Sequence, residues 1–551
     1  MNILKLNCIA FLTLVIFFTL PNYLYSQKIS TNNLIVLEQN RRMQITSDSS
    51  SLFFQNNAYQ LLTENIEKII INKGSIFNSK LPYNYGILPL NLQSRYSSRT
   101  IYPEVSTLIN NVGFQYYVSS GFFASVGPLS VQIQPEYIYA QNRDFEIGPM
   151  KSNNTEYLER FGDGHFSKIL PGQSSVRLNF GAFSVGASTE NIWWGPGQFN
   201  SLIFSNNAFG FRHLTLNTRR PAKTFLGNFE GQVILGRLEG SGFDSPINQL
   251  LKDDWRYLNG ISFIYQPKWI SGFFVGVSRT FQQYNSMRTK SFGDLFPIFE
   301  GFQKERLVED PSNSLEFDRR GQDQQLSGFA RFVNPKAKFE VYFEYGRRDH
   351  ALNWREAILN PEHARAYLFG FKKLIPILNE AFIQVRGEVV QQQESINIII
   401  RYPGTGGAQN WGGHIPVHHG FTNQGQMLGP GVGPSSNVQT LEASWVKGFK
   451  KLGLRLERLN RHQDIYQKRF PDPSEQGRWV DLSARLLADW QWDNLIISSN
   501  INFVNSLNYQ WQLSPNSTPD FPQGQNLFSV HSQVSLIYLF QKQKGLSKPV
   551  N

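Results

Sequence analysis

Several segments of the chain alternate strictly between apolar and polar residues, and this two-residue period constrains the fold more than any other feature. Leu129, Val131 and Ile133, for example, alternate with polar neighbours. The clearest segments cover residues 129–139, 339–345, 383–389 and 528–540. An amphipathic helix would repeat its apolar positions every 3.6 residues, so this period indicates β-strands with one apolar and one polar face.

The connections between these segments alternate between short and long. Short turns rich in Gly, Pro, Asn or Asp fall near residues 127–128, 181–182, 221–227, 266–268, 334–335, 376–379, 448–453 and 493–494. Long polar segments cover residues 142–172, 190–210, 240–255, 285–324, 349–362, 394–435, 461–476 and 508–525, and a further loop before residue 111 follows a first strand near 87–93. Outer-membrane barrels have short periplasmic turns and longer outer loops. Nine loops and eight turns predict an all-β fold, an up-and-down antiparallel β-barrel of about 18 strands.

Composition supports a barrel that crosses a membrane with strands. The chain has 551 residues, which would ordinarily suggest several domains, but large barrels are an exception to that rule. Aromatic residues make up 14% and charged residues 17%. After residue 26, we find no run near the ~18 apolar residues that a spanning helix needs. We therefore expect the protein to be located in the outer membrane of a Gram-negative-type cell.

The N-terminal region divides into two expected parts. Lys5, an apolar run over residues 9–20 and the small Ser26 predict a cleaved signal peptide at 1–26, which would remove Cys8, the only cysteine. Residues 27–81 are expected to be a periplasmic helical region, because apolar residues recur every three or four positions over 50–73, with a shorter helix at 34–43. This region either braces or plugs the barrel foot, or docks a secretion partner. The barrel itself is expected at 82–541, followed by a basic tail at 542–551.

The charge balance is basic. Lys and Arg number 53 against 42 Asp and Glu, so removal of Lys5 with the signal leaves 52 − 42, or +10. This charge suits acidic surroundings such as lipopolysaccharide or an acidic polysaccharide. Solvated loop and turn charges would give the same balance.

One motif narrows the function further. Residues 190–211 contain Trp193 and Trp194, the turn Gly195-Pro196-Gly197, and the tetrapeptide Ser205-Asn206-Asn207-Ala208, a composition typical of a rigid loop. A related stretch at 420–426 leads to Leu428 and Gly429. These linked elements resemble the signature of the Wzi family of capsule assembly proteins, over roughly residues 82–540. The resemblance implies an 18-stranded outer-membrane barrel with N-terminal helices, which assists attachment of polysaccharide after export and catalyses no reaction.

Catalytic and cofactor motifs are not apparent. The sequence has no Gly-x-Ser-x-Gly, His-Glu-x-x-His or phosphate-loop pattern, so we expect no enzyme activity and no cofactor. His414, His418 and His419 lie close in sequence but lack nearby ligands that would complete a metal site. Glu136 and Glu190 would need a defined separation to hydrolyse a glycoside, and the sequence does not set it.

Recognition of a hydroxyl-rich ligand remains as the expected chemistry. Tryptophan rings offer flat faces to sugar rings, and amides donate to and accept from hydroxyls. The candidate polysaccharide-binding residues are Trp193, Trp194, Asn206, Asn207, Asn410 and Trp411, and the motif residues Gly195, Pro196, Gly197 and Ser205 have either a structural or a binding role. The alternative for the tryptophans and asparagines is packing of a loop folded into the lumen.

The expected partners follow from this chemistry. They are a capsular polysaccharide or exopolysaccharide, outer-membrane lipid and lipopolysaccharide, and periplasmic secretion components, with no nucleic acid. The rival function is a porin or specific channel for saccharides or hydrophobic compounds, because 18 strands leave room for a lumen. The position of the long loops, inside the lumen or clear of it, separates the two.

Overall fold

The computed structural model describes residues 34–46, 72–76, 81–102, 108–145, 155–243, 254–289, 292–301, 321–351, 353–395, 411–470 and 477–540. The expected signal peptide, the basic tail, residues 50–71 of the expected long helix and Asn410 lie outside this part. Residues 72 and 73, which we expected to end that helix, instead belong to strand β1 (Asn72–Ile76), which pairs antiparallel with β2.

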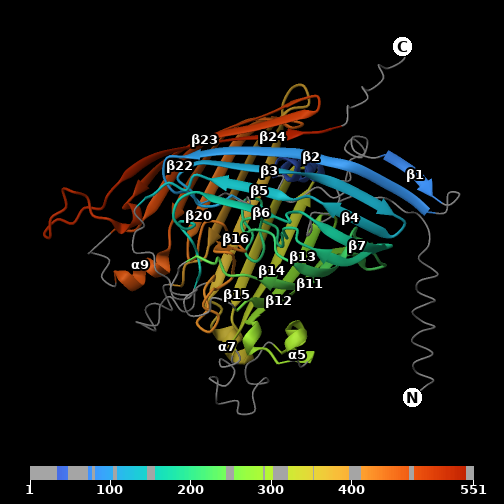
Figure 1. Ribbon diagram of the computed structural model, residues 1–551, viewed down its shortest axis with the longest axis horizontal. Coiled ribbons are helices and arrows are strands. Elements are labelled where there is room, and N and C mark those ends of the chain that lie inside the picture. The colour runs from blue at the N-terminus through green and yellow to red at the C-terminus, as the bar shows by residue number, and fades with distance from the viewer. Residues whose placement is uncertain are drawn as a thin grey trace.

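Eighteen antiparallel strands form a closed barrel, as the turn count predicted (Figure 1). The wall strands are β2 (Leu81–Ser97), β3 (Gly113–Val126), β4 (Leu129–Ile133) with β5 (Glu136–Ala140), β6 (Phe166–Leu170) with β7 (Ser175–Phe180), β8 (Phe183–Ser188), β9 (His213–Thr218), β11 (Gly227–Leu238), β12 (Arg256–Pro267), β13 (Phe273–Tyr284), β14 (Gln322–Asn334), β15 (Phe339–Arg348), β16 (Arg365–Pro376), β17 (Phe382–Gln391), β20 (Asn437–Lys447), β21 (Lys450–Asn460), β22 (Val480–Trp492), β23 (Leu495–Leu507) and β24 (Leu527–Tyr538). Strand β24 closes the barrel by pairing with β2 from Leu90↔Tyr538 to Ser97↔His531.

Two wall strands are interrupted at the same level. The segment we expected as one strand divides into β4 and β5 around Pro135, because proline cannot donate to the ladder. Its neighbour divides into β6 and β7 near Gly172, which has φ +61° and bridges to Gln134. The break leaves the ladder continuous, since β4 pairs with β7 and β5 with β6.

The barrel is apolar outside and polar inside. On β3, Phe114, Tyr116 and Val118 are exposed on the outer wall, whereas Gln115 and Ser119, at the alternate positions, are buried. Strands of membrane barrels alternate in this way because one face meets lipid and the other meets the lumen. Buried charged residues therefore gather in the lumen rather than on the surface.

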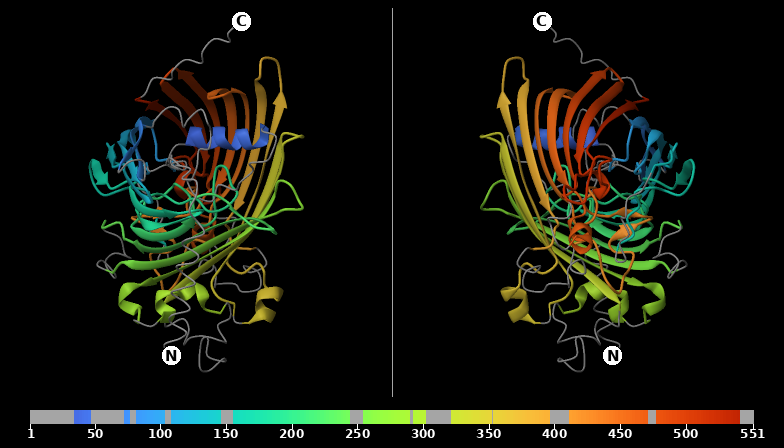
Figure 2. Two further views of the ribbon diagram at one scale, coloured as in Figure 1. Left: turned by 90° about the vertical axis from the view of Figure 1, so that its right-hand side faces the viewer. Right: turned by 90° about the vertical axis from the view of Figure 1, so that its left-hand side faces the viewer.

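Helices occupy the two ends of the barrel. Helix α2 (Leu34–Thr46) lies inside the ring of strands near one end (Figure 2). Its Arg42 donates to the carbonyl of Gly448 in the β20–β21 turn, which identifies this as the turn end. The short helices α5 (Phe292–Leu295), α7 (Trp354–Leu359) and α9 (Gln463–Arg469) belong to the long loops. Within the described residues, no helix is long and apolar enough to cross a membrane.

Small elements complete the described structure. They are β10 (Ala222–Lys223), the hairpin of β18 (Thr422–Asn423) and β19 (Gln426–Met427), and the 3₁₀ turns η1 (Asn285–Met287), η2 (Pro297–Phe299) and η4 (Tyr509–Trp511). All except β10 lie in the long loops.

Candidate functional site

The motif loop, residues 189–212, enters the lumen and is held there by a buried carboxylate. Glu388 of β17 accepts hydrogen bonds from the backbone amides of Gln198 (2.6 Å), Phe199 (3.1 Å) and Asn200 (2.7 Å). It also accepts from the hydroxyl of Tyr342 at 2.8 Å. A carboxylate with several N–H donors is a strong anchor because each bond is charge-assisted. The turn after Gly197 is thereby fixed to the barrel wall.

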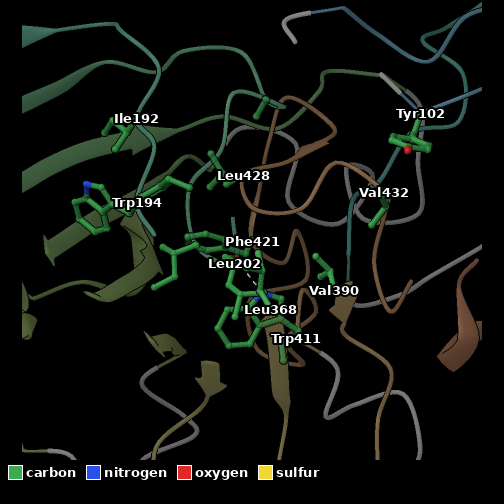
Figure 3. Close-up of a cluster of buried hydrophobic side chains, with 14 of the residues drawn as sticks. Tyr102, Ile192, Trp194, Leu202, Leu368, Val390, Trp411, Phe421, Leu428 and Val432 are labelled. Atoms are coloured by element: carbon green, nitrogen blue, oxygen red, sulfur yellow. Dashed lines mark hydrogen bonds between the residues drawn. The ribbon is translucent and has the colours of Figure 1, made fainter. Parts of the chain in front are cut away.

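Two tryptophans from different loops pack inside the barrel against its wall (Figure 3). Trp194 is fully buried, and its indole N–H donates to Gln232 of β11 at 2.9 Å. Trp411, from the loop 392–436, is 1% exposed and donates to the carbonyl of Leu202 at 3.0 Å. Gly260 and Gly346 of the wall make room for these rings, since a Cβ would lie 3.0 Å from the Trp194 ring and 2.5 Å from the Trp411 ring.

The Ser-Asn-Asn-Ala tetrapeptide lies against the second motif stretch. The Ser205 amide donates to Leu428 O at 2.8 Å, and its hydroxyl donates to Gly429 O at 2.6 Å. The Asn207 side chain donates to Met427 O at 2.8 Å. Two segments more than 200 residues apart thus form one layer across the lumen. Arg256 of β12 secures the same layer by donating to Gly420 O at 2.6 Å and Thr422 O at 2.9 Å.

Helix α2 docks directly on the motif turn. Arg41 donates to Pro196 O at 2.6 Å and to Gly197 O at 3.0 Å, and it pairs with Glu340 of β15 at 2.8 Å. Its guanidinium also lies 4.9 Å from the centre of the Tyr342 ring. The N-terminal helix and the motif loop therefore share one set of contacts inside the barrel.

A second acidic residue fixes α2 to the wall. Glu38 pairs with Arg386 of β17 and Lys451 of β21, each at 3.0 Å, and with Arg42 of its own helix at 2.7 Å. Burial alone would raise the pKa of the Glu38 carboxyl, but the charges of Arg386, Lys451 and Arg42 hold it well below its ordinary value. Glu38 is thus ionised at neutral pH.

The candidate residues from the sequence are largely brought together. Trp194, Asn206, Asn207 and Trp411 are buried in the loop layer, and Trp193 is half-buried. Gly195, Pro196 and Gly197 form the turn that α2 contacts. In this arrangement solvent does not reach Trp194 or Asn206, so their packing role is evident, and a sugar contact for the candidate set stays a prediction.

The other residues weighed for chemistry have separate partners. Glu190 pairs with Arg177 at 2.8 Å, while Glu136 accepts from Tyr117 at 2.9 Å and Gln173 at 3.0 Å. Burial and the nearby charge of Arg256 lower the pKa of His419 to about 3, so the imidazole is neutral. Among the described residues, no three His, Cys, Asp or Glu side chains gather as a metal site would require.

Two outer loops are joined by a buried aromatic cluster that was not expected from the sequence. Tyr466, Trp479, Tyr509 and Trp511 form a buried cluster that joins the loop 461–479 to the loop 508–526. The rings of Trp479 and Trp511 meet edge to face at 6.0 Å. Beneath the cluster, Arg461 pairs with Asp481 at 2.6 Å, and Asp481 accepts from the Trp479 indole at 2.9 Å. The available signal was the aromatic content of the two loops, with Tyr466 and Trp479 in the first and Tyr509 and Trp511 at the start of the second.

Aromatic side chains also stand exposed on the outer loops. Phe299 of η2, Trp354 of α7 and Phe521 of the last loop are 72%, 57% and 75% exposed. Exposed aromatic rings are open to stacking on sugar faces. The described site therefore has two parts: a lumen layer that closes the barrel, and an outer surface with accessible rings.

These features define a class of protein: a membrane-type β-barrel closed by its own loops and an N-terminal helix. A sequence profile of the family described as Capsule assembly protein Wzi matches residues 107–511. The chain belongs to this family, which confirms the resemblance seen in the motif loop.

Structural comparison agrees with the family assignment at the level of fold. The structure of Wzi from Escherichia coli, described as an outer-membrane protein involved in group 1 capsule assembly and a carbohydrate-binding β-barrel, superposes with a TM-score of 0.55 at 11% identity. The match covers 82% of this chain and 85% of that one.

Two further solved structures match less closely. OccAB2 of Acinetobacter baumannii gives a TM-score of 0.39 at 9% identity, and OprD of Pseudomonas aeruginosa gives 0.36 at 7%. They cover 82% of this chain and 97% and 92% of their own, and at these scores they carry no argument about function. No curated protein matches the chain.

Proposed function

We propose that this protein sits in the outer membrane after loss of its signal peptide, binds surface polysaccharide, and assists attachment and assembly of a capsule or exopolysaccharide layer without catalysing a reaction. Membership of the Wzi family supports the role. The carbohydrate-binding character of the Escherichia coli protein supports the ligand class.

The observation that carries the proposal is the position of the long loops. The motif loop and residues 411–436 lie inside the lumen and bond to the wall: Trp194 bonds to β11, the turn after Gly197 to β17, and Gly420 to β12. A filled lumen favours a surface that binds over a conduit that transports. The rival function as a porin would require these loops to lie outside the lumen.

Binding is assigned to the outer surface, where accessible rings lie on rigid supports. Trp354 begins α7, whose first turn is capped by the Asn353 side chain accepting from the Glu356 amide at 2.9 Å. Half-buried Trp193 is the member of the motif pair that a ligand could also reach. Lipopolysaccharide and periplasmic secretion components are further proposed partners, consistent with the basic charge.

The test is binding of the detergent-solubilised barrel to polysaccharide isolated from the surface of the same cells. We expect Trp354→Ala to lower the affinity about two- to tenfold, because an aromatic stacking contact contributes about 0.5–1.5 kcal/mol. Trp269→Ala is the matched control, since Trp269 is 70% exposed but lies in a turn at the opposite end.

Phe521→Ala with Phe225→Ala forms a second matched pair. Phe521 lies in an outer loop, and Phe225 is 84% exposed at the turn end. Equal binding by all four variants and wild type would contradict the outer-surface assignment. Absence of any binding by the wild type would contradict the function itself.

A further inference from the structure

The outer wall of the barrel carries a hollow of about 520 Å³ that the proposed function does not use. It spans strands β20 to β23, with Val389 of β17 and Phe528 of β24 at its two edges. Its apolar lining side chains point away from the lumen; Leu441 and Leu456, for instance, are 49% and 48% exposed. The hollow therefore faces the surroundings of the barrel.

Strand register explains why the wall is recessed here. Ala484 of β22 stands directly between Leu456 of β21 and Phe503 of β23. Because a methyl group separates two large outward side chains, a groove runs over Ala484. Phe503 and Phe528 stack at 6.4 Å with 16° between their planes, which gives one side of the groove a continuous apolar wall.

Polar side chains edge the groove toward the outer loops. One row further out, the register places Gln439, Arg458, Leu482 and Asn505 side by side on the outward face. Arg458 is exposed, and among the described residues it forms no hydrogen bond or ion pair.

The place of Arg458 on its own strand makes the charge unusual. Leu452, Leu454 and Leu456 of β21 face outward and are 51%, 43% and 48% exposed, and Arg458 is the next residue on that face. A cation that borders an apolar, lipid-facing surface is costly without an anionic partner, and it indicates a site.

We propose that the groove holds an acyl chain of a phosphorylated glycolipid from the surrounding leaflet, with its phosphate at Arg458 and its sugar against the amides of Gln439 and Asn505. Guanidinium and phosphate match in charge and geometry. The inference rests on the outer-membrane location proposed above.

A second copy of the chain fits the groove less well. A stable dimer buries about 800 Å² on each partner, over a broad surface. The recess here is a narrow groove with a single cation at one end, a shape and charge that suit one chain and one head group.

The experiment is native mass spectrometry of the full chain in detergent, with lipid A that carries phosphate and the same lipid A after its phosphate is removed. The wild-type protein should retain one molecule of phosphorylated lipid A in preference to the lipid A that lacks phosphate. Arg458→Gln should lower that retention about fivefold and abolish the preference, since one cation near an anionic lipid contributes about that factor. Arg458→Lys should keep the preference.

Ala484→Leu fills the groove and should lower retention of both lipids. Ala187→Leu is the matched control, because Ala187 is an exposed outward alanine on β8 outside the groove. Equal retention by all variants would overturn the proposal. Loss of a two-copy species in Ala484→Leu, with lipid retention unchanged, would assign the groove to a second chain instead.

The location is checked separately. Wild type that does not insert into outer-membrane lipid vesicles as a heat-modifiable barrel would contradict the proposed function. Insertion with unselective lipid retention would contradict this inference alone.

Discussion

Trp193 and Trp194, the two adjacent tryptophans of the motif turn, have different surroundings in the structure, although nothing in the sequence assigns them different roles. Trp194 is fully buried, packs edge to face on Phe204 at 4.9 Å and donates to Gln232, whereas Trp193 is half-buried. We expect Trp194→Ala to reduce the free energy of unfolding by about 3–5 kcal/mol and Trp193→Ala by about 1 kcal/mol. Denaturant unfolding in detergent measures both. Equal losses would contradict the packing role assigned to Trp194.

Gly195 tests the motif turn from the backbone side. It has φ +117°, and a Cβ there would lie 2.7 Å from Glu344 Oε2. Gly195→Ala should therefore cost about 1–3 kcal/mol and loosen the turn that α2 contacts. Gly181→Ala is the control, because Gly181 has φ +57° and a Cβ there would have no described atom within 4 Å. Similar melting temperatures for the two variants would contradict a strained motif turn.

Residue identity alone could not assign these roles. The turn glycines and the Ser205–Ala208 tetrapeptide were recognisable from spacing, and the partner segment at Leu428 was too. The anchoring role of Glu388 was not recognisable from the sequence, because this residue lies in an ordinary alternating strand and nothing local distinguishes it from other inward-facing acids. Its role depends on a turn almost 190 residues away in the chain.

At the scale of elements, strands were predictable and the helix contacts were not. Two-residue alternation and turn composition locate strands because each signal is local. The short helix was expected at residues 34–43 and is observed as α2, Leu34–Thr46. Its docking depends on charges on β15, β17 and β21, which the sequence separates by hundreds of residues.

The docking of α2 should weaken only when the pH falls far enough to protonate Glu38. The pKa of Glu38 is depressed when docked, so its stabilising effect is full above the ordinary glutamate pKa and is lost as pH falls through the docked value. We expect α2 to stay protected from proteolysis down to pH well below about 4.3. Release near pH 5 to 6 would contradict the ion pairs.

Glu38→Gln should release α2 at neutral pH. The substitution leaves Arg386 and Lys451 without this partner, and breaking a buried pair costs about 3–5 kcal/mol. Protease cleavage within residues 34–46 measures the release. Glu356→Gln is the control, since Glu356 pairs with Arg347 at 2.8 Å in an outer loop. Barrel folding should be unchanged in both, because these acids are not part of the ladder.

At the scale of the whole molecule, α2 and the loop layer both lie inside the barrel and contact each other at the motif turn, and this arrangement bears on the choice between binding and transport. Helix α2 lies at the turn end, and the motif loop with residues 411–436 spans the lumen beyond it. We expect no large, steady conductance from wild type in planar bilayers.

Glu38→Gln should also stay closed, because Glu388, Gln232 and Arg256 hold the loop layer without α2. Glu388→Ala combined with Arg256→Ala should instead give opening events, since it detaches the loops from two walls. Steady conductance in the wild type would favour the porin function, and a closed double variant would show that packing around Trp194 and Trp411 alone seals the lumen.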